Sequence, residues 1–145
     1  MFKKYIMIPL GGIGSRFKEK NYKEPKALIE VNGKPIIYWL IDNLKIINST
    51  TIIIPYNFNE YKDMCFENKL KKKYPDIDFK FYPIYNNTRG AVETIKIGID
   101  YLINDLIYYP VINTVKALEL NNYPILCIDS DNFYLNDIIN EWNGE

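Results

Sequence analysis

A chain of 145 residues, 48% of them hydrophobic and 25% charged, has the composition of one globular domain with a core of its own. Its 18 basic and 18 acidic residues cancel, which argues against a nucleic acid or an anionic membrane as partner. The chain has no histidine, and its two cysteines, Cys65 and Cys127, are far apart in the sequence. It therefore has almost no ligands for zinc and cannot use histidine in catalysis. Any metal that it binds must be a hard cation with oxygen ligands. The N-terminal apolar run is too short to span a membrane and is followed by no signal-peptide cleavage site, so we expect a cytoplasmic protein.

Apolar runs of strand length alternate with helical patterns along the chain. Strands are predicted at residues 5–10, 50–55, 78–84 and 123–129, and helices at 33–45, 59–73, 90–103 and 135–142. Residues 104–122 are hard to interpret, apart from a candidate short helix at 111–120. The alternation predicts an α/β fold, a Rossmann-like and mostly parallel sheet flanked by helices, forming a single domain over residues 1–145.

Polar and glycine-rich segments follow three of the predicted strands, where ligands bind in open α/β sheets. After the first strand comes "GGIGSR" (residues 11–16, the glycine loop), after the third "NNTRGAVET", and after the fourth "DSDNFY". A glycine loop exposes backbone N–H groups to anions, and Arg16 and Lys26 add charge for a triphosphate. Asp129 and Asp131 suit Mg²⁺, which takes one or two carboxylates together with phosphates. These segments predict a nucleotide–metal site, although the glycine cluster alone is more typical of a flexible strand-to-helix turn.

The spacing of the loop fits neither the GxGxxG pattern nor a Walker loop. It resembles the signature of the sugar-phosphate nucleotidyltransferases, a GxGxR loop followed by PK and by a helix that starts with GKP. Here the signature is "GGIGSRFKEKNYKEPKALIEVNGKPII". The later "TRGAVET" is similar to the base-side glycine loop of that family, and "CIDSDNFY" is similar to its metal-binding strand end.

The resemblance implies a role for each matching residue. Arg16, together with the loop, holds the β- and γ-phosphates that leave as pyrophosphate, and Lys26 contacts the α-phosphate and stabilises the transition state; both are therefore the catalytic residues. Asp131, with Asp129 as a second carboxylate, binds Mg²⁺. The residues implied to bind the nucleotide are Leu10, Gly11, Gly12, Gly14, Ser15, Arg16, Lys26, Gly90 and Ala91.

The reaction implied is Mg²⁺-dependent transfer of a nucleotidyl group from an NTP to a sugar 1-phosphate or a related phosphate, with release of pyrophosphate, for nucleotide-sugar and surface-glycan biosynthesis. Family members continue well beyond the position that corresponds to Glu145, and the continuation binds the sugar phosphate. The resemblance therefore implies that this chain is truncated at its C-terminus and lacks the acceptor-binding part. A sheet edge left unpaired in this way also predicts association, for instance as a homo-oligomer.

Two other functions stay open at the level of sequence. A glycosyltransferase could use "DSD" to hold a nucleotide-sugar through a metal, but the GxGxR and PK pattern does not fit it. A non-catalytic nucleotide-binding module is the third reading. Single residues also have structural alternatives: Asp131 as a helix cap, Asp129 as a loop hydrogen-bonding group, and Arg89 and Glu93 as solvated surface residues.

Overall fold

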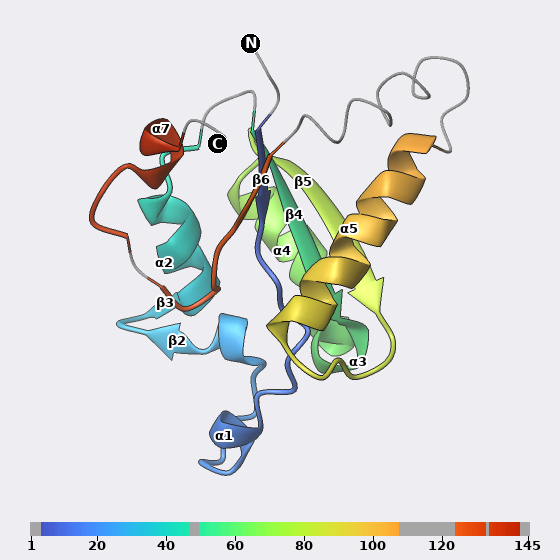
Figure 1. Cartoon of the computed structure of the whole chain (residues 1–145). Coiled ribbons are helices and arrows are strands. Elements are labelled where there is room, and N and C mark those ends of the chain that lie inside the picture. The colour runs from blue at the N-terminus through green and yellow to red at the C-terminus, as the bar shows by residue number, and fades with distance from the viewer. Residues whose placement is uncertain (1–3, 47–49, 108–123, 133, 143–145) are drawn as a thin grey trace.

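The computed structural model describes residues 4–46, 50–107, 124–132 and 134–142. Its centre is a four-stranded sheet in the order β5-β4-β1-β6, in which every neighbouring pair is parallel (Figure 1). The strands are β1 (Lys4–Met7), β4 (Thr50–Asn57), β5 (Asp78–Ile84) and β6 (Ile125–Cys127). The predicted α/β architecture with a mostly parallel sheet is confirmed.

Helices cover both faces of this sheet, because successive strand residues point to opposite sides. Tyr5 and Met7 pack with Leu102 of α5 (Ala91–Ile107) on one face. Ile6 and Ile8 belong to the larger cluster on the other face. That face is covered by α2 (Ile36–Asn43), α3 (Phe58–Tyr61), α4 (Phe66–Lys73) and α7 (Ile138–Glu141). Such two-sided burial explains the apolar runs of the two central strands, β1 and β4.

The single helix predicted over 59–73 is wrong, because the segment is divided into α3, a 3-10 turn at Lys62–Met64 (η2), and α4. The division falls at Cys65, whose φ of 49° lies in the left-handed region. Tyr61 and Phe66 are five residues apart, a spacing that would separate them on a continuous helix. The left-handed residue brings both into the core, with ring centroids 4.6 Å apart.

The first strand is shorter than predicted because Pro9 has no N–H to donate to a neighbour. The extended pairing with β4 nevertheless continues, since Leu10 N–H donates to the Pro55 carbonyl at 2.8 Å and forms an isolated bridge with Tyr56. β4 runs two residues beyond its predicted end, to Asn57. The two central strands thus stay paired up to the residue that precedes the glycine loop.

Four short elements follow the first strand where only a loop and a helix start were predicted. They are α1 (Ser15–Lys18), the 3-10 turn η1 (Lys26–Leu28), and a two-stranded hairpin of β2 (Glu30–Val31) and β3 (Lys34–Pro35). The hairpin turns at Asn32 and Gly33, which both have positive φ. In Figure 1 the glycine loop, α1 and the loop before α5 (residues 85–90) gather at the lower end of the sheet, where the strands finish.

The remaining predicted elements are found with altered ends. α2 is shorter than the predicted helix at 33–45, α5 extends four residues past its predicted end, and α7 is shorter than predicted. β6 occupies only the middle of the predicted run at 123–129. The candidate helix at 111–120 lies outside the described residues. Among the helices described, none combines the length and the apolarity that a membrane crossing requires.

Candidate functional site

A cavity of about 660 Å³ opens at the carboxyl ends of the strands. It is built from three segments far apart in the sequence: the glycine loop with α1 and Lys26, the residues that lead into α5, and the turn after β6. Cavities of this size hold small molecules in many proteins. Every residue that the sequence singled out lines it, namely Leu10, Gly11, Gly12, Gly14, Ser15, Arg16, Lys26, Gly90, Ala91, Asp129 and Asp131.

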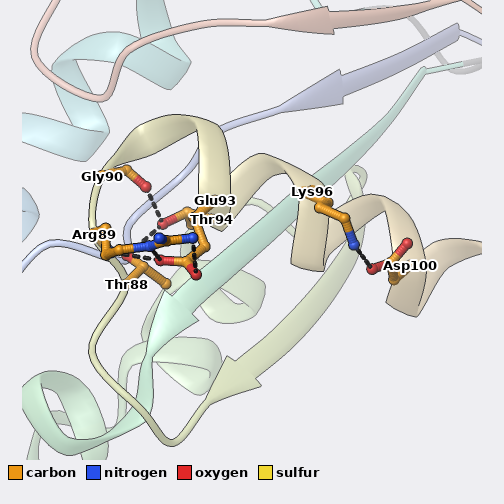
Figure 2. Close-up of polar contacts among 7 residues, drawn as sticks. All are labelled: Thr88, Arg89, Gly90, Glu93, Thr94, Lys96 and Asp100. Atoms are coloured by element: carbon orange, nitrogen blue, oxygen red, sulfur yellow. Dashed lines mark hydrogen bonds and ion pairs between the residues drawn. The ribbon is translucent and has the colours of Figure 1, made fainter.

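Gly11 lies directly against the residues that lead into α5. A Cβ atom at this position would come within 2.8 Å of Thr88 Oγ1 and closer still to Thr94 Oγ1. These two hydroxyls are 2.8 Å apart and hydrogen-bonded, and Thr94 Oγ1 also donates to the Gly90 carbonyl at 3.1 Å (Figure 2). The absence of a side chain at Gly11 therefore lets two walls of the cavity pack against each other.

We expect Gly11→Ala to lower the free energy of unfolding by about 1–3 kcal/mol, because the added methyl group must displace the paired threonines. Gly12→Ala is the matched control, since nothing lies within 4 Å of a Cβ atom there. It should change stability by less than about 0.5 kcal/mol. Urea denaturation of both variants measures the difference. Equal stability of the two would show that the Gly11 contact is not tight.

The backbone of the glycine loop is exposed from Gly12 onward, whereas Gly11 is buried against Thr88 and Thr94. Leu10 is different, because its N–H donates to Pro55 and its carbonyl accepts from Asn57 N–H at 3.0 Å. Within the described residues, no hydrogen bond is found to the backbone N–H of Gly11 or of Gly12. Gly14, the residue directly before α1, has a φ of 63°. This left-handed conformation suits glycine. Leu10 lines the cavity although both of its backbone groups bond to β4, so its role in binding the nucleotide stays a prediction, as do those of the glycines.

Arg89 and Glu93 pair with each other at the start of α5 (Figure 2). Glu93 Oε2 accepts the Arg89 backbone N–H at 2.6 Å, and the two side chains lie 3.4 Å apart. The backbone hydrogen bond and then the side-chain hydrogen bond from Arg89 hold the pKa of Glu93 below its ordinary value. Glu93 does not line the cavity, so it acts as a local cap of the helix, whereas Arg89 lies at the rim. Farther along α5, Lys96 and Asp100 form a separate pair at 2.9 Å (Figure 2).

Lys26 and Asp131 form an ion pair inside the cavity, with Nζ and Oδ2 2.6 Å apart. The two residues come from segments more than a hundred positions apart in the sequence, and each was singled out for a different task. Asp131 is not the cap of the following helix, because α7 begins only at Ile138. Its side chain is 45% exposed and that of Lys26 34% exposed, so the pair stabilises the fold by only about 0–1 kcal/mol. A ligand with strong charges can therefore replace it at low cost.

Tyr61 is a cavity residue that the sequence did not indicate. It is 3% exposed, and its ring packs at 5.9 Å from Tyr56 and 4.6 Å from Phe66. Burial raises the pKa of its phenol, and the neighbouring backbone of Ala27 lowers it by a smaller amount. Ala27 follows Lys26 in the short turn η1, so Tyr61 lies beside the turn that carries this lysine. Only the folded chain shows the contact, because 34 residues separate the partners and no motif connects them.

The donor set at the end of β6 suits a hard divalent cation. Asp129 and Asp131 both line the cavity, while Ser130 between them is buried. The Asn132 N–H donates to the Asp129 backbone carbonyl at 3.5 Å, which closes a turn and leaves the carboxylate of Asp129 out of this contact. No group of three or more His, Cys, Asp or Glu side chains with metal-binding geometry occurs in the described ranges. Two carboxylates fit Mg²⁺, which completes its shell with phosphates and water, better than they fit a metal with an all-protein cage.

The chain is similar to known proteins in sequence and in fold. The bifunctional protein GlmU of Aliarcobacter butzleri is 32% identical over 95 residues, 63% of this chain and 20% of that protein. A nucleoside-diphosphate-sugar pyrophosphorylase from Vibrio cholerae superposes with a TM-score of 0.56 and 20% identity, covering 94% of this chain and 52% of that one. A protein described as a glucose-1-phosphate thymidylyltransferase from Bacillus anthracis gives a TM-score of 0.61 at 19% identity, covering 95% and 48%. No protein-family model matches the chain.

The resemblance to the sugar-phosphate nucleotidyltransferases is confirmed. The fold, in particular, is that of the nucleotidyltransferases, because two solved structures cover nearly the whole chain. This chain spans about a fifth of the curated nucleotidyltransferase relative and about half of each solved structure. What it shares with the nucleotidyltransferases is therefore one part of their length.

Proposed function

We propose that this chain binds a nucleoside triphosphate with Mg²⁺ and forms the nucleotide-binding part of an enzyme that transfers a nucleotidyl group to a sugar 1-phosphate or a related phosphate. Pyrophosphate is the second product. The proposal assigns the reaction to the cytoplasm, where nucleoside triphosphates are available. The observation that carries it is the meeting of three motif segments, the glycine loop, the residues before α5 and the turn after β6, in one cavity.

The charges of this cavity suit the proposed substrate. Arg16 is the last residue of the glycine loop and lies on α1, where it would contact an anion held by the loop amides. Lys26 lines the same cavity, close to Gly14 and in contact with Asp131. Guanidinium and ammonium groups bind phosphate oxygens through short, charge-assisted hydrogen bonds. Two cations that line one cavity therefore fit a chain of phosphates better than a single carboxylate or phosphate.

The proposed reaction needs no protein nucleophile. The acceptor phosphate attacks the α-phosphorus of the NTP, the bond to the β-phosphate oxygen breaks, and pyrophosphate leaves with the electron pair. Phosphoryl-type transfer depends on positioning and on charge stabilisation, so the absence of histidine is compatible with it. Asp131 and Asp129 are the residues that would hold Mg²⁺, which neutralises phosphate charge when it is bound. If Asp131 held Mg²⁺, its ion pair with Lys26 would open, and the ammonium group of Lys26 would be free to contact the α-phosphate.

Arg16→Ala tests the assignment of the leaving phosphates. We expect the Kd for NTP with Mg²⁺ to rise about 10- to 100-fold, since a charge-assisted contact with phosphate contributes about 1.5–3 kcal/mol. The Kd for the matching NMP should change less than about twofold. Isothermal titration of both nucleotides into the variant and the wild type gives the comparison. Equal losses for NTP and NMP would place Arg16 away from the terminal phosphates.

The same titration separates the proposal from a DxD glycosyltransferase. Such an enzyme binds a nucleotide-sugar through its diphosphate, so the wild type would prefer an NDP-sugar to an NTP. A nucleotidyltransferase site prefers the NTP and binds pyrophosphate as well. A wild-type chain that binds the NDP-sugar more tightly than any NTP would therefore favour the glycosyltransferase.

A further inference from the structure

Four basic side chains line the cavity, and only two of them form ion pairs with carboxylates that the structure describes. Lys26 is paired with Asp131 at 2.6 Å, and Arg89 is paired with Glu93 at 3.4 Å. Arg16 and Lys20 have no ion-pair partner among the carboxylates that the structure describes. Two cations that face one cavity without a counter-ion indicate an anionic ligand at that side of it. Arg16 is already assigned to the leaving phosphates, whereas Lys20 matches no motif position.

The backbone fixes where Lys20 lies. After α1 the chain closes a tight turn in which Lys20 N–H donates to the Phe17 carbonyl at 3.0 Å and Tyr22 N–H donates to the same carbonyl at 3.1 Å. The Phe17 and Tyr22 rings pack edge to face, with centroids 5.9 Å apart. Lys20 thus lies just beyond the end of α1, the short helix that carries Arg16. Both side chains line the cavity.

Lys18, two residues earlier, differs from Lys20 in having an ion-pair partner outside the cavity. Its Nζ forms an ion pair with Glu60 of α3 at 2.7 Å, and the residue does not line the cavity. Lys18 therefore attaches the loop to α3. The same short segment thus carries one lysine with a structural partner and one with an open cavity in front of it.

We infer that Lys20 is a second binding residue for the terminal phosphates of the NTP, acting beside Arg16, and that it favours triphosphate and pyrophosphate over monophosphate. The inference rests on the proposed function, since it adds a residue to that site. A pyrophosphate group carries several negative charges along its length, so one guanidinium alone leaves much of that charge unbalanced. Lys20 supplies the second cation from a side chain that the fold leaves unpaired.

The test compares Lys20→Gln with Lys18→Gln, two variants that remove the same charge two residues apart. Isothermal titration with Mg²⁺–NTP, with pyrophosphate and with NMP gives the Kd values. Lys20→Gln should raise the Kd for NTP and pyrophosphate about tenfold and that for NMP less than about twofold. Lys18→Gln should leave all three within about twofold of the wild type. Lys20→Arg, which keeps the charge, should restore most of the NTP affinity.

Wild-type affinity for NTP in Lys20→Gln would overturn the inference and leave the proposed function intact. The inference would also fail if Lys18→Gln lost as much affinity for NTP as Lys20→Gln. The loss would then come from the change in net charge and not from the position of Lys20. Equal losses for NTP and NMP would place Lys20 elsewhere in the cavity. A wild-type chain that binds neither NTP nor pyrophosphate would contradict the proposed function itself, and the inference with it.

Discussion

Replacing Asp131 by asparagine should abolish the gain in NTP affinity that Mg²⁺ provides, because the neutral amide cannot attract a hard cation. With Mg²⁺ present, the Kd for NTP should rise about 10- to 100-fold. In EDTA, the variant should bind NTP at least as tightly as the wild type, because it lacks the carboxylate that repels phosphate and pairs with Lys26. The melting temperature should hardly change, since the ion pair with Lys26 is half exposed and contributes at most about 1 kcal/mol.

Asp105→Asn is the matched control for this variant. Asp105 forms a comparable pair with Lys80 at 3.2 Å, with its side chain 48% exposed, and it lies away from the cavity. In the Asp105→Asn variant, Mg²⁺ should raise the affinity for NTP as much as it does in the wild type. An Asp131→Asn chain in which Mg²⁺ still tightens NTP binding by the wild-type factor would exclude Asp131 as a metal ligand.

The second large effect concerns Lys26. We expect Lys26→Gln to reduce the kcat of pyrophosphate release about 10²–10³-fold, because a charge at the reacting phosphate acts mainly in the transition state. The KM for NTP should rise only a few-fold, as the remaining cations and the glycine loop still hold the substrate. Steady-state pyrophosphate release by the complete protein, with NTP and a panel of sugar 1-phosphates, measures both constants. Lys80→Gln, which opens the corresponding remote pair, is the control.

A defect confined to the KM would contradict this role of Lys26. It would show that the lysine binds the ground state and the transition state equally well. The contact with Asp131 would then matter only as a link between η1 and the turn after β6.

The sheet could be predicted from the sequence because its two central strands, β1 and β4, are buried on both faces almost throughout. A continuous apolar run such as that at 50–55 differs from the three-to-four-residue spacing of apolar residues in the helices around it. Alternation of such strands with helices implies that the strands are parallel. The order of the strands was not predicted, because nothing local in a run of isoleucines specifies its neighbour. The break at Cys65 also escaped prediction, since no glycine or proline marks it and the cause is the packing of Tyr61 and Phe66 in the core.

One missed element did have a signal. Asn32-Gly33 is the residue pair that favours a two-residue β-hairpin turn, and the structure forms that hairpin. The prediction took the segment only as the start of a helix, because "GKP" dominated its interpretation. One short segment can therefore contain the signals for two elements, here the hairpin turn and the helix α2 that begins directly after the hairpin.

The segments of the candidate site were predicted from motifs, but the contacts between them were not. The glycine loop and the carboxylates after β6 each stand out locally, and strand ends in a parallel sheet meet at one edge. The ion pair of Lys26 with Asp131 and the fit of Gly11 against Thr94 depend on side chains brought together by the fold. Lys20 was overlooked because an isolated lysine in a polar segment is usually solvated, and only the distribution of partners distinguishes it from Lys18.

Backbone amide NMR during titration with Mg²⁺ and each of the four NTPs tests the central claim most directly. A second cavity, of about 720 Å³, lies between the β2–β3 hairpin and the helical segment at 64–69, and it serves as the internal comparison. The account predicts saturable shifts at Gly11, Gly12, Gly14 and Gly90 with at least one NTP, larger with Mg²⁺ than without. Shifts that cluster around Tyr22, Tyr38 and Met64 of the second cavity, or no saturable shift with any NTP, would contradict it.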